Sequence, residues 1–411
     1  MIENKEISLS PIKEMELRAS RIPGVVSLAQ GVPSFDTPES VKRAAIEAIE
    51  KGKVAKYSLT PGTLEFRETI AQYLEEENKF FDFETEIIAT AGSIEAITAT
   101  LLAILEPGDE VLIPDPTYAS YQPAIKVARG IPVFVPLDEE NHWALDIDKF
   151  EKLITPRTKA FLFCNPNNPT GTIFTHNQLH ALAQLAIKHN IYILSDEVYK
   201  DFVYPVKSLV RPGASQSEAF NGVNDSDERL YSLAELRGIR DRLIYIFSFS
   251  KAYAMTGWRI AFLATHQELA KKILPVHDAL VTCAPVVSQF AAQAALEMAD
   301  EDVSEFKRYF KKRRDLICKR LDRLSHVFEY QKPNSAYFVF PRVNKEIMRK
   351  IARNSGSWEF AIELLEKTKV ALVPGAAFGP SGENHVRMCF GRSEDDINEA
   401  FNRMERFFEN F

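Results

Sequence analysis

A lysine, two serines and an arginine that could together hold a phosphorylated aldehyde lie within a dozen residues of the chain. The stretch runs from Ser248 to Arg259 and follows an apolar run, Leu243 to Phe247, that predicts a buried β-strand. In an open α/β sheet, ligands bind beyond the carboxyl ends of the strands. A lysine placed there loses hydration, which lowers its pKa and makes its amine a nucleophile toward aldehydes.

The residues around Lys251 are of the kinds that bind phosphate. Ser248 and Ser250 offer hydroxyl donors, and Arg259 offers a planar guanidinium group. An amine nucleophile beside a phosphate site indicates pyridoxal phosphate, held by the lysine as a Schiff base. A solvated lysine in a loop and an ordinary Ser-x-Ser turn are the alternatives that this stretch leaves open by itself.

Composition argues against several other classes of protein. The 411 residues are 45% hydrophobic, which is ample for a packed core and allows two to three domains. The net charge of −7 argues against nucleic-acid binding, and we find neither a membrane-spanning apolar run nor a signal peptide. The four scattered cysteines form no CxxC metal pair and no disulfide framework. We therefore expect a cytoplasmic protein without a metal site, and no nucleic-acid or membrane partner.

The elements that must position these residues follow from the apolar patterns. Short apolar runs predict strands at 87–90, 110–113, 131–136, 158–164, 191–194, 243–247 and 260–264. Helical periodicity predicts a helix at 38–51 with Val41, Ala45 and Ile49 on one face, and others near 64–74, 146–154 and 175–189. A long helical stretch at 266–325 is expected to break near Pro275 and Pro285. The last quarter has the pattern of an α+β domain.

Polar residues that could do chemistry follow several of these strands. Asp196 lies just after the run at 191–194. Its carboxylate could keep a pyridine nitrogen protonated there, or it could merely cap a helix. The turn Gly92-Ser93-Ile94 opens a helix, and free N–H groups there can bind an anion. Arg387 lies on an apolar strand, 385–390, and needs an anionic partner, which is either a substrate carboxylate or a structural ion pair.

These motifs resemble those of the class I/II aminotransferases, the fold-type I pyridoxal-phosphate enzymes typified by aspartate aminotransferase. The resemblance extends from Gly31 to Arg387 in family order. Its most specific parts are Asn-Pro-Thr-Gly at 168–171, Asp-x-x-Tyr at 196–199, and Ser-x-Ser-Lys at 248–251 followed by Gly-Trp-Arg.

The resemblance implies a role for each matching residue. Tyr118 would stack on the pyridine ring, Asn168 and Tyr199 would bond its phenolic oxygen, and Tyr57 would reach the phosphate of the partner subunit's cofactor. The catalytic residues implied are Lys251, Asp196 and Tyr199. The implied cofactor contacts are Tyr57, Gly92, Ser93, Ile94, Tyr118, Asn168, Asp196, Tyr199, Ser248, Ser250, Lys251 and Arg259, and the substrate contacts are Gly31, Asn168 and Arg387, with Arg387 on the α-carboxylate.

The same resemblance implies the architecture. An α/β fold is expected, with a large domain built on a mostly parallel seven-stranded sheet and a smaller α+β domain formed by both chain ends. We place an N-terminal arm at 1–40, the large pyridoxal-phosphate domain at 41–275 and the small domain at 276–411. A homodimer with shared active sites is implied as well.

The function implied is amino-group transfer between an α-amino acid and a 2-oxo acid by ping-pong transamination. A β-lyase or an aminocyclopropanecarboxylate-synthase-like enzyme on the same scaffold is the alternative, and an effector-binding regulatory protein is a third reading. Three departures from the family pattern stand out. Ser335 replaces a usual glycine, residues 205–230 form an atypical polar insertion, and Ile94 stands where one bacterial branch of aspartate aminotransferases carries a lysine for the distal carboxylate.

Overall fold

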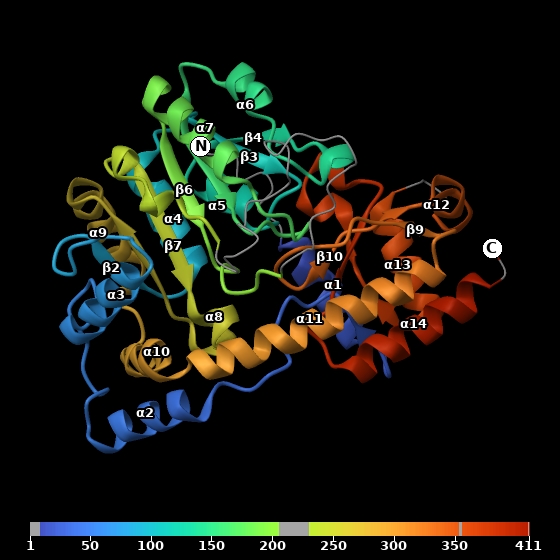
Figure 1. The fold of residues 1–411 in the computed structure, drawn as a ribbon, viewed down its shortest axis with the longest axis horizontal. Coiled ribbons are helices and arrows are strands. Elements are labelled where there is room, and N and C mark those ends of the chain that lie inside the picture. The colour runs from blue at the N-terminus through green and yellow to red at the C-terminus, as the bar shows by residue number, and fades with distance from the viewer. Residues whose placement is uncertain (1–8, 205–229, 353–355, 410) are drawn as a thin grey trace, which may run out of the picture.

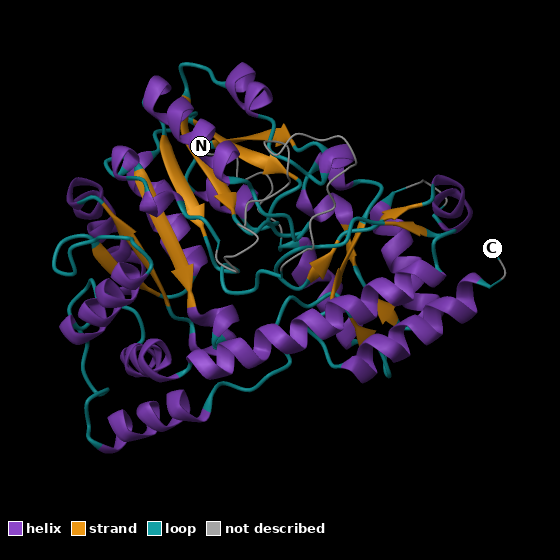
Figure 2. Cartoon of the chain, in the orientation of Figure 1, coloured by secondary structure: helices purple, strands orange, loops and turns teal. Residues whose placement is uncertain are grey.

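A seven-stranded sheet lies at the centre of the computed structural model, which describes residues 9–204, 230–352, 356–409 and 411 (Figures 1 and 2). The strands in spatial order are β2 (Ile87–Thr90), β8 (Ala261–Thr265), β7 (Leu243–Ser248), β6 (Tyr192–Asp196), β5 (Thr158–Cys164), β3 (Glu110–Asp115) and β4 (Ile131–Pro136). Only the pairs that β8 makes with β2 and β7 are antiparallel. The predicted α/β fold with a mostly parallel seven-stranded sheet is therefore confirmed.

Helices cover both faces of this sheet. On one face lie α4 (Ser93–Ile104), α5 (Tyr121–Val127) and α9 (Gln267–Val281), and on the other lie α3 (Leu64–Glu76), α6 (Ile147–Leu153), α7 (His176–His189) and α10 (Val286–Met298). Successive side chains of a strand point to opposite faces, so Ile244 and Ile246 of β7 join one apolar core while Tyr245 and Phe247 join another. Burial on both faces explains the continuous apolar runs in the sequence.

A second group of elements is built from both ends of the chain. Strand β1 (Val26–Ser27) pairs in parallel with β12 (Val370–Ala371), which ties the N-terminal segment to the last quarter. Beside them are the antiparallel strands β13 (Val373–Pro374), β14 (Val386–Cys389) and β10 (Phe338–Val339), the pair β9 (Phe328–Glu329) and β11 (Arg342–Val343), and the helices α1 (Pro11–Ser20), α12 (Lys345–Ile351), α13 (Ser357–Thr368) and α14 (Glu394–Phe408). Helix α11 (Asp300–Arg323) runs between the two groups (Figure 1). The boundaries at residues 40 and 275 remain predictions.

Two local expectations were wrong. Helix α9 continues through Pro275, because the proline removes only one intrahelical hydrogen bond while Ile273 and His277 bury their side chains beside it. In α2 (Glu39–Glu50) the third buried residue is Ala48, whereas Ile49 is 56% exposed. Ile49 is eight residues after Val41, which places it about 80° past two full helical turns. Ala48 is seven residues after Val41, only about 20° short of two turns. The stripe that packs on α10 therefore passes through Ala48.

No helix in the described ranges is both long and apolar enough to cross a membrane.

Candidate active site

A cavity of about 410 Å³ opens at the carboxyl ends of β5, β6 and β7. Most of the residues predicted for the site line this cavity. They are Gly31, Ser93, Ile94, Tyr118, Asn168, Asp196, Tyr199, Ser248, Ser250, Lys251, Arg259 and Arg387. Parallel strands deliver their C-terminal residues to one edge of a sheet, which is why Cys164 of β5 and Ser248 of β7, 84 positions apart in the chain, both line this cavity.

Lys251 lies on the short helix α8 (Phe249–Ala252), directly after β7. Its Nζ donates a hydrogen bond to the carbonyl oxygen of Gly31, 2.8 Å away. Loss of hydration lowers the pKa of the Lys251 amine to about 8, and the nearby charges of Arg387 and Arg259 act in the same direction. A substantial fraction of this amine is therefore neutral, and nucleophilic, near neutral pH.

Asp196 ends β6 and is 2% exposed. The hydroxyl of Tyr121 donates to its Oδ2 over 2.7 Å, while its Oδ1 has no hydrogen-bond partner within the described part of the chain. Burial raises the pKa of this carboxyl to about 6, against the opposing effect of the Tyr121 bond. A buried acceptor without a donor is costly, so Oδ1 is ready to accept a proton-bearing nitrogen from a ligand.

Tyr121, the first residue of α5, was missed in the sequence, although it lies only three residues after Tyr118. The two rings meet edge to face at 5.4 Å. Tyr118 precedes the helix that Tyr121 begins, and the three-residue spacing does not show that the second hydroxyl reaches Asp196.

Arg387 on β14 is 1% exposed and lies between the rings of Phe338 and Phe378, with its guanidinium carbon 4.5 and 4.9 Å from their centres. Its Nη1 donates to Asn168 Oδ1 over 3.0 Å and its Nη2 to the carbonyl of Ala29 over 2.7 Å. Among the described residues, no carboxylate forms an ion pair with it, and its Nε has no hydrogen-bond partner. This arrangement favours a substrate anion over a structural ion pair.

An amide and a phenol lie next to this arginine. The Nδ2 of Asn168 donates to the hydroxyl of Tyr199 over 3.3 Å, so Arg387, Asn168 and Tyr199 form one chain of polar contacts. Each group in it retains capacity for a further bond to an anionic or phenolic oxygen in the cavity.

The other end of the cavity gathers donors for an anion. Arg259 has a left-handed backbone, with φ of 53°, and its Nη2 lies 3.5 Å from the carbonyl of Ala91. A Cβ at Gly92 would overlap this guanidinium, so Gly92, with φ of 93°, makes room for it without lining the cavity itself. Ser93 begins α4, whose first N–H groups lack intrahelical partners.

Tyr57 is the predicted site residue that the structure places elsewhere. Its side chain is 82% exposed and does not line the cavity of its own chain. Conversely, the cavity mouth includes residues of α1 that were not predicted, namely Ile12, Lys13 and Glu16, together with Ser120 and Phe338. Nothing in the motif around α1 marks those residues, because they reach the cavity only through the pairing of β1 with β12.

The departures from the family pattern have different outcomes. Ser335 is fully buried and donates its hydroxyl to the carbonyl of Gly171 over 2.7 Å, so its extra polar atom is satisfied. Ile94 lines the cavity as an apolar side chain. The proposed insertion at 205–230 lies outside the described residues except for Leu230.

Comparison with known proteins supports one family throughout. The model of the family described as aminotransferase class I and II matches residues 23–404. Aromatic-amino-acid aminotransferase 2 of Thermococcus litoralis is 37% identical over 97% of this chain and 96% of its own length, and an aspartate aminotransferase of Pyrococcus abyssi is 35% identical over 97% and 96%. The structure of aspartate aminotransferase from Thermus thermophilus with maleate superimposes with a TM-score of 0.85 at 32% identity, covering 97% of both chains. That of an aromatic aminotransferase from Pyrococcus horikoshii OT3 gives 0.83 at 35% identity, over 96% and 99%.

Proposed function

Because the chain belongs to the class I and II aminotransferases and is an aminotransferase, we propose that it uses pyridoxal phosphate, bound at Lys251, to exchange amino groups between α-amino and 2-oxo acids. The observation that carries the proposal is the pairing, in one cavity, of a poorly hydrated lysine amine with a buried carboxylate oxygen that has no donor among the described residues. The β-lyase and regulatory alternatives have no such support from the relatives.

The residues present fit this cofactor. Its phosphate would lie at the N-terminus of α4 with Ser93, Ser248, Ser250 and Arg259, and Gly92 leaves the space for that arginine. Tyr118 would stack on the ring, and Asn168 and Tyr199 would bond its phenolic oxygen. Bound pyridoxal phosphate supplies an electron-accepting ring, and Asp196 would hold the proton on its nitrogen.

Lys251 has a second role in this proposal. Once its amine is free, it can accept the proton from the substrate α-carbon and later donate that proton to the cofactor. A base with a pKa of about 8 is well matched to this work at neutral pH. The hydrogen bond to Gly31 holds the amine over the cavity floor between these steps.

Arg387 would bind the substrate α-carboxylate, and Gly31 keeps that position open. A Cβ on Gly31 would lie 3.1 Å from the Phe338 ring and 3.7 Å from Arg387 Nη2. The aromatic rings on both sides of the guanidinium exclude water, which strengthens a pair with a carboxylate.

Arg387→Lys is expected to weaken every α-amino acid substrate while leaving cofactor binding intact. Lysine presents a point charge in place of a bidentate fork, and losing a hydrogen bond to a charged group costs about 1.5–3 kcal/mol, or roughly ten- to a hundredfold in affinity. Half-reaction rates measured against donor concentration give this affinity. Amines without an α-carboxylate serve as the control, and equal impairment of both kinds of donor would show a structural role for Arg387.

Steady-state kinetics test the proposed function itself. Aromatic amino acids and aspartate are the first donors to try, because the relatives include aminotransferases named for each, and 2-oxoglutarate and pyruvate are the acceptors. Ping-pong transfer gives parallel double-reciprocal lines and a half-reaction without acceptor. Ammonia release from the donor in place of amino transfer would favour the lyase alternative.

We also propose a homodimer in which the partner subunit's Tyr57 completes the cofactor phosphate site. The support is that Tyr57 is 82% exposed and that other apolar side chains near it in sequence, at Ile46, Ile49 and Leu59, are 53%, 56% and 64% exposed. Exposed apolar side chains in such number are typical of a subunit interface.

Hybrid dimers test this arrangement sharply. Tyr57→Ala should lose cofactor affinity and Lys251→Ala should lose turnover, yet mixing the two unfolded chains and refolding them together should restore activity. Each hybrid dimer would contain one site with both wild-type residues, so about a quarter of wild-type activity is expected from random pairing. No recovery on mixing would place Tyr57 in its own chain's site or outside both.

A cytoplasmic location remains a prediction. The four cysteines are buried and unpaired in the structure, which supports a reducing compartment.

A further inference from the structure

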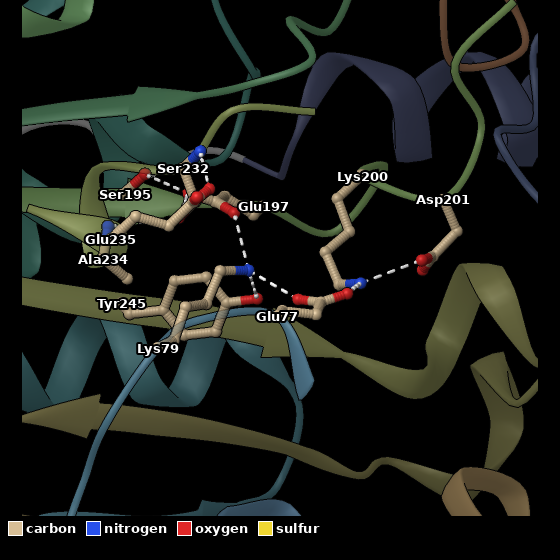
Figure 3. A network of polar contacts seen from close by, with 10 residues as sticks. All are labelled: Glu77, Lys79, Ser195, Glu197, Lys200, Asp201, Ser232, Ala234, Glu235 and Tyr245. Carbon is tan, nitrogen blue, oxygen red and sulfur yellow. Dashed lines mark hydrogen bonds and ion pairs between the residues drawn. The ribbon is translucent and has the colours of Figure 1, made fainter. Parts of the chain in front are cut away.

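A buried cluster of charges surrounds Glu197, the residue that follows Asp196 in the chain (Figure 3). We call it the Glu197 cluster. Its charged members are Glu77, Lys79, Glu197, Lys200 and Asp201, and its neutral members are Ser195, Ser232 and Tyr245.

Different residues of the stretch 195–201 line the cavity and join the cluster. Asp196 and Tyr199 line the cavity, whereas the side chains of Glu197 and Lys200 enter the cluster. The sheet holds the backbone here on both sides, since the N–H of Asn165 donates to the carbonyl of Asp196 over 3.0 Å and the N–H of Glu197 donates to the carbonyl of Ile246 over 2.9 Å. The strand pairing ends at Asp196, and side-chain bonds of the next residue add to these backbone restraints.

Glu197 provides those bonds. It is 1% exposed, and its Oε1 accepts from the hydroxyls of Ser195 at 3.1 Å and Ser232 at 2.6 Å. Its Oε2 has no hydrogen-bond partner among the described residues and lies at ion-pair distance, 3.7 Å, from the Nζ of Lys79. Burial raises the pKa of Glu197, and the charge of Lys79 opposes that rise.

The lysines connect this carboxylate to another part of the chain. Lys79 is 2% exposed, contacts Glu77 at 2.6 Å, and lies over the ring of Tyr245. Lys200 contacts Glu77 at 2.5 Å and Asp201 at 2.9 Å. Burial opposes ionisation of Glu77, yet the two ammonium groups bring its pKa to about 2. The turn that carries Asp196 is thereby held to the segment after α3.

We propose that Glu197 and Lys79 are positioning residues for Asp196, holding its turn from behind so that its free oxygen faces the ring nitrogen of the bound cofactor. This inference rests on the proposed function, since it assigns the cluster to that same site. Buried ion pairs contribute little net stability compared with apolar packing, but their directed bonds can fix one orientation. An apolar cluster of the same volume would lack the two serine bonds to Glu197.

The test uses the holoenzyme with Glu197→Ala, Glu197→Gln and Lys79→Met. Asp196 keeps a positive charge on the cofactor ring, and that charge lowers the pKa of the nitrogen that joins the ring to Lys251. If Glu197→Ala displaces Asp196, the pH midpoint of the cofactor's visible absorbance should rise by about one pH unit or more. The kcat should fall by up to about a hundredfold with little change in KM, as for a misplaced catalytic group.

Conservative and combined variants separate positioning from stability. Glu197→Gln keeps an oxygen for both serine hydroxyls and should retain most of the wild-type midpoint. In an Asp196→Asn background, Glu197→Ala should add nothing further, because the cluster acts only through Asp196. Glu405→Ala breaks another shielded ion pair, with Arg320 between α11 and α14, and should lower the melting temperature without moving the midpoint.

An unchanged midpoint in Glu197→Ala, or an additional shift in the Asp196→Asn background, would overturn the proposal. If Glu197→Ala does not fold, Lys79→Met takes its place, because it removes the ion-pair partner of Glu197, and a raised midpoint is again required. The proposed function fails separately, if the wild-type protein neither takes up pyridoxal phosphate nor transfers an amino group.

Discussion

Lys251→Ala is expected to abolish amino transfer, with a loss of about ten-thousandfold or more in kcat, because the proposed function makes the same side chain both the covalent anchor and the general base. Among the described residues that line the cavity, no second lysine near α8 could replace it. The other lining lysine, Lys13, lies on α1. The measurement is turnover with saturating donor and acceptor. Absorbance of the lysine-bound cofactor should disappear as well, while the phosphate contacts still hold the cofactor noncovalently.

A control separates this effect from a general loss of lysine charge. Lys188→Ala removes an exposed lysine whose partner is Glu151, at 2.5 Å, and should leave turnover unchanged. Near-normal turnover in Lys251→Ala would contradict the central assignment of the site, whatever the state of the cofactor absorbance.

Capture of pyridoxal phosphate by the cofactor-free wild-type protein should depend on pH through the same residue. The pKa of Lys251 is lowered to about 8 by burial, so the neutral amine becomes the major form above that pH. Stopped-flow capture rates should rise through pH 8 and then level, well below the ordinary lysine value of 10.5. A capture rate that continues to rise up to pH 10 would indicate a fully hydrated amine and would contradict a pKa of Lys251 lowered by burial.

The fold was largely predictable because its strands are buried on both faces. Runs such as 243–247 and 160–164 are unbroken apolar segments, and the polar residues that follow them mark the cavity edge without knowledge of the packing. The positions of Lys251 and Asp196 in one cavity follow from that topology, whereas Arg387 reaches the cavity from β14 of the second group of elements. Their roles remain predictions that the experiments above address.

Other features depend on packing angles that a linear sequence does not encode. Tyr121 reaches Asp196 only because α5 approaches the end of β6, and Lys79 meets Glu197 across 118 positions of sequence. Tyr57 is exposed in the single chain, and its proposed role depends on a second subunit. Local patterns predict which elements form, whereas these contacts are set by how the elements dock.

Asp196→Asn is expected to leave cofactor attachment intact and to remove most of the catalytic power. The amide keeps the shape of the side chain and can still accept from Tyr121, but it carries no charge to hold a proton on the ring nitrogen. Removing one preorganised electrostatic contact of this kind typically costs about a hundred- to a thousandfold in kcat. Single-turnover decay of the donor complex measures that loss apart from substrate binding and product release.

The same substitution should stabilise the cofactor-free protein, and the pH dependence gives the sign. The pKa of Asp196 is about 6 in the folded chain against 3.8 ordinarily, so the folded state binds more protons between those values and its stability falls as pH rises through them. At pH 7 the ionised carboxylate therefore costs about 2–3 kcal/mol, which Asn avoids. Thermal unfolding of the cofactor-free proteins should show Asp196→Asn as the more stable at pH 7, with the gain vanishing near pH 4. A variant that is both less active and less stable at pH 7 would make Asp196 a structural cap, whereas lower activity with higher stability is what a carboxylate buried for its chemistry requires.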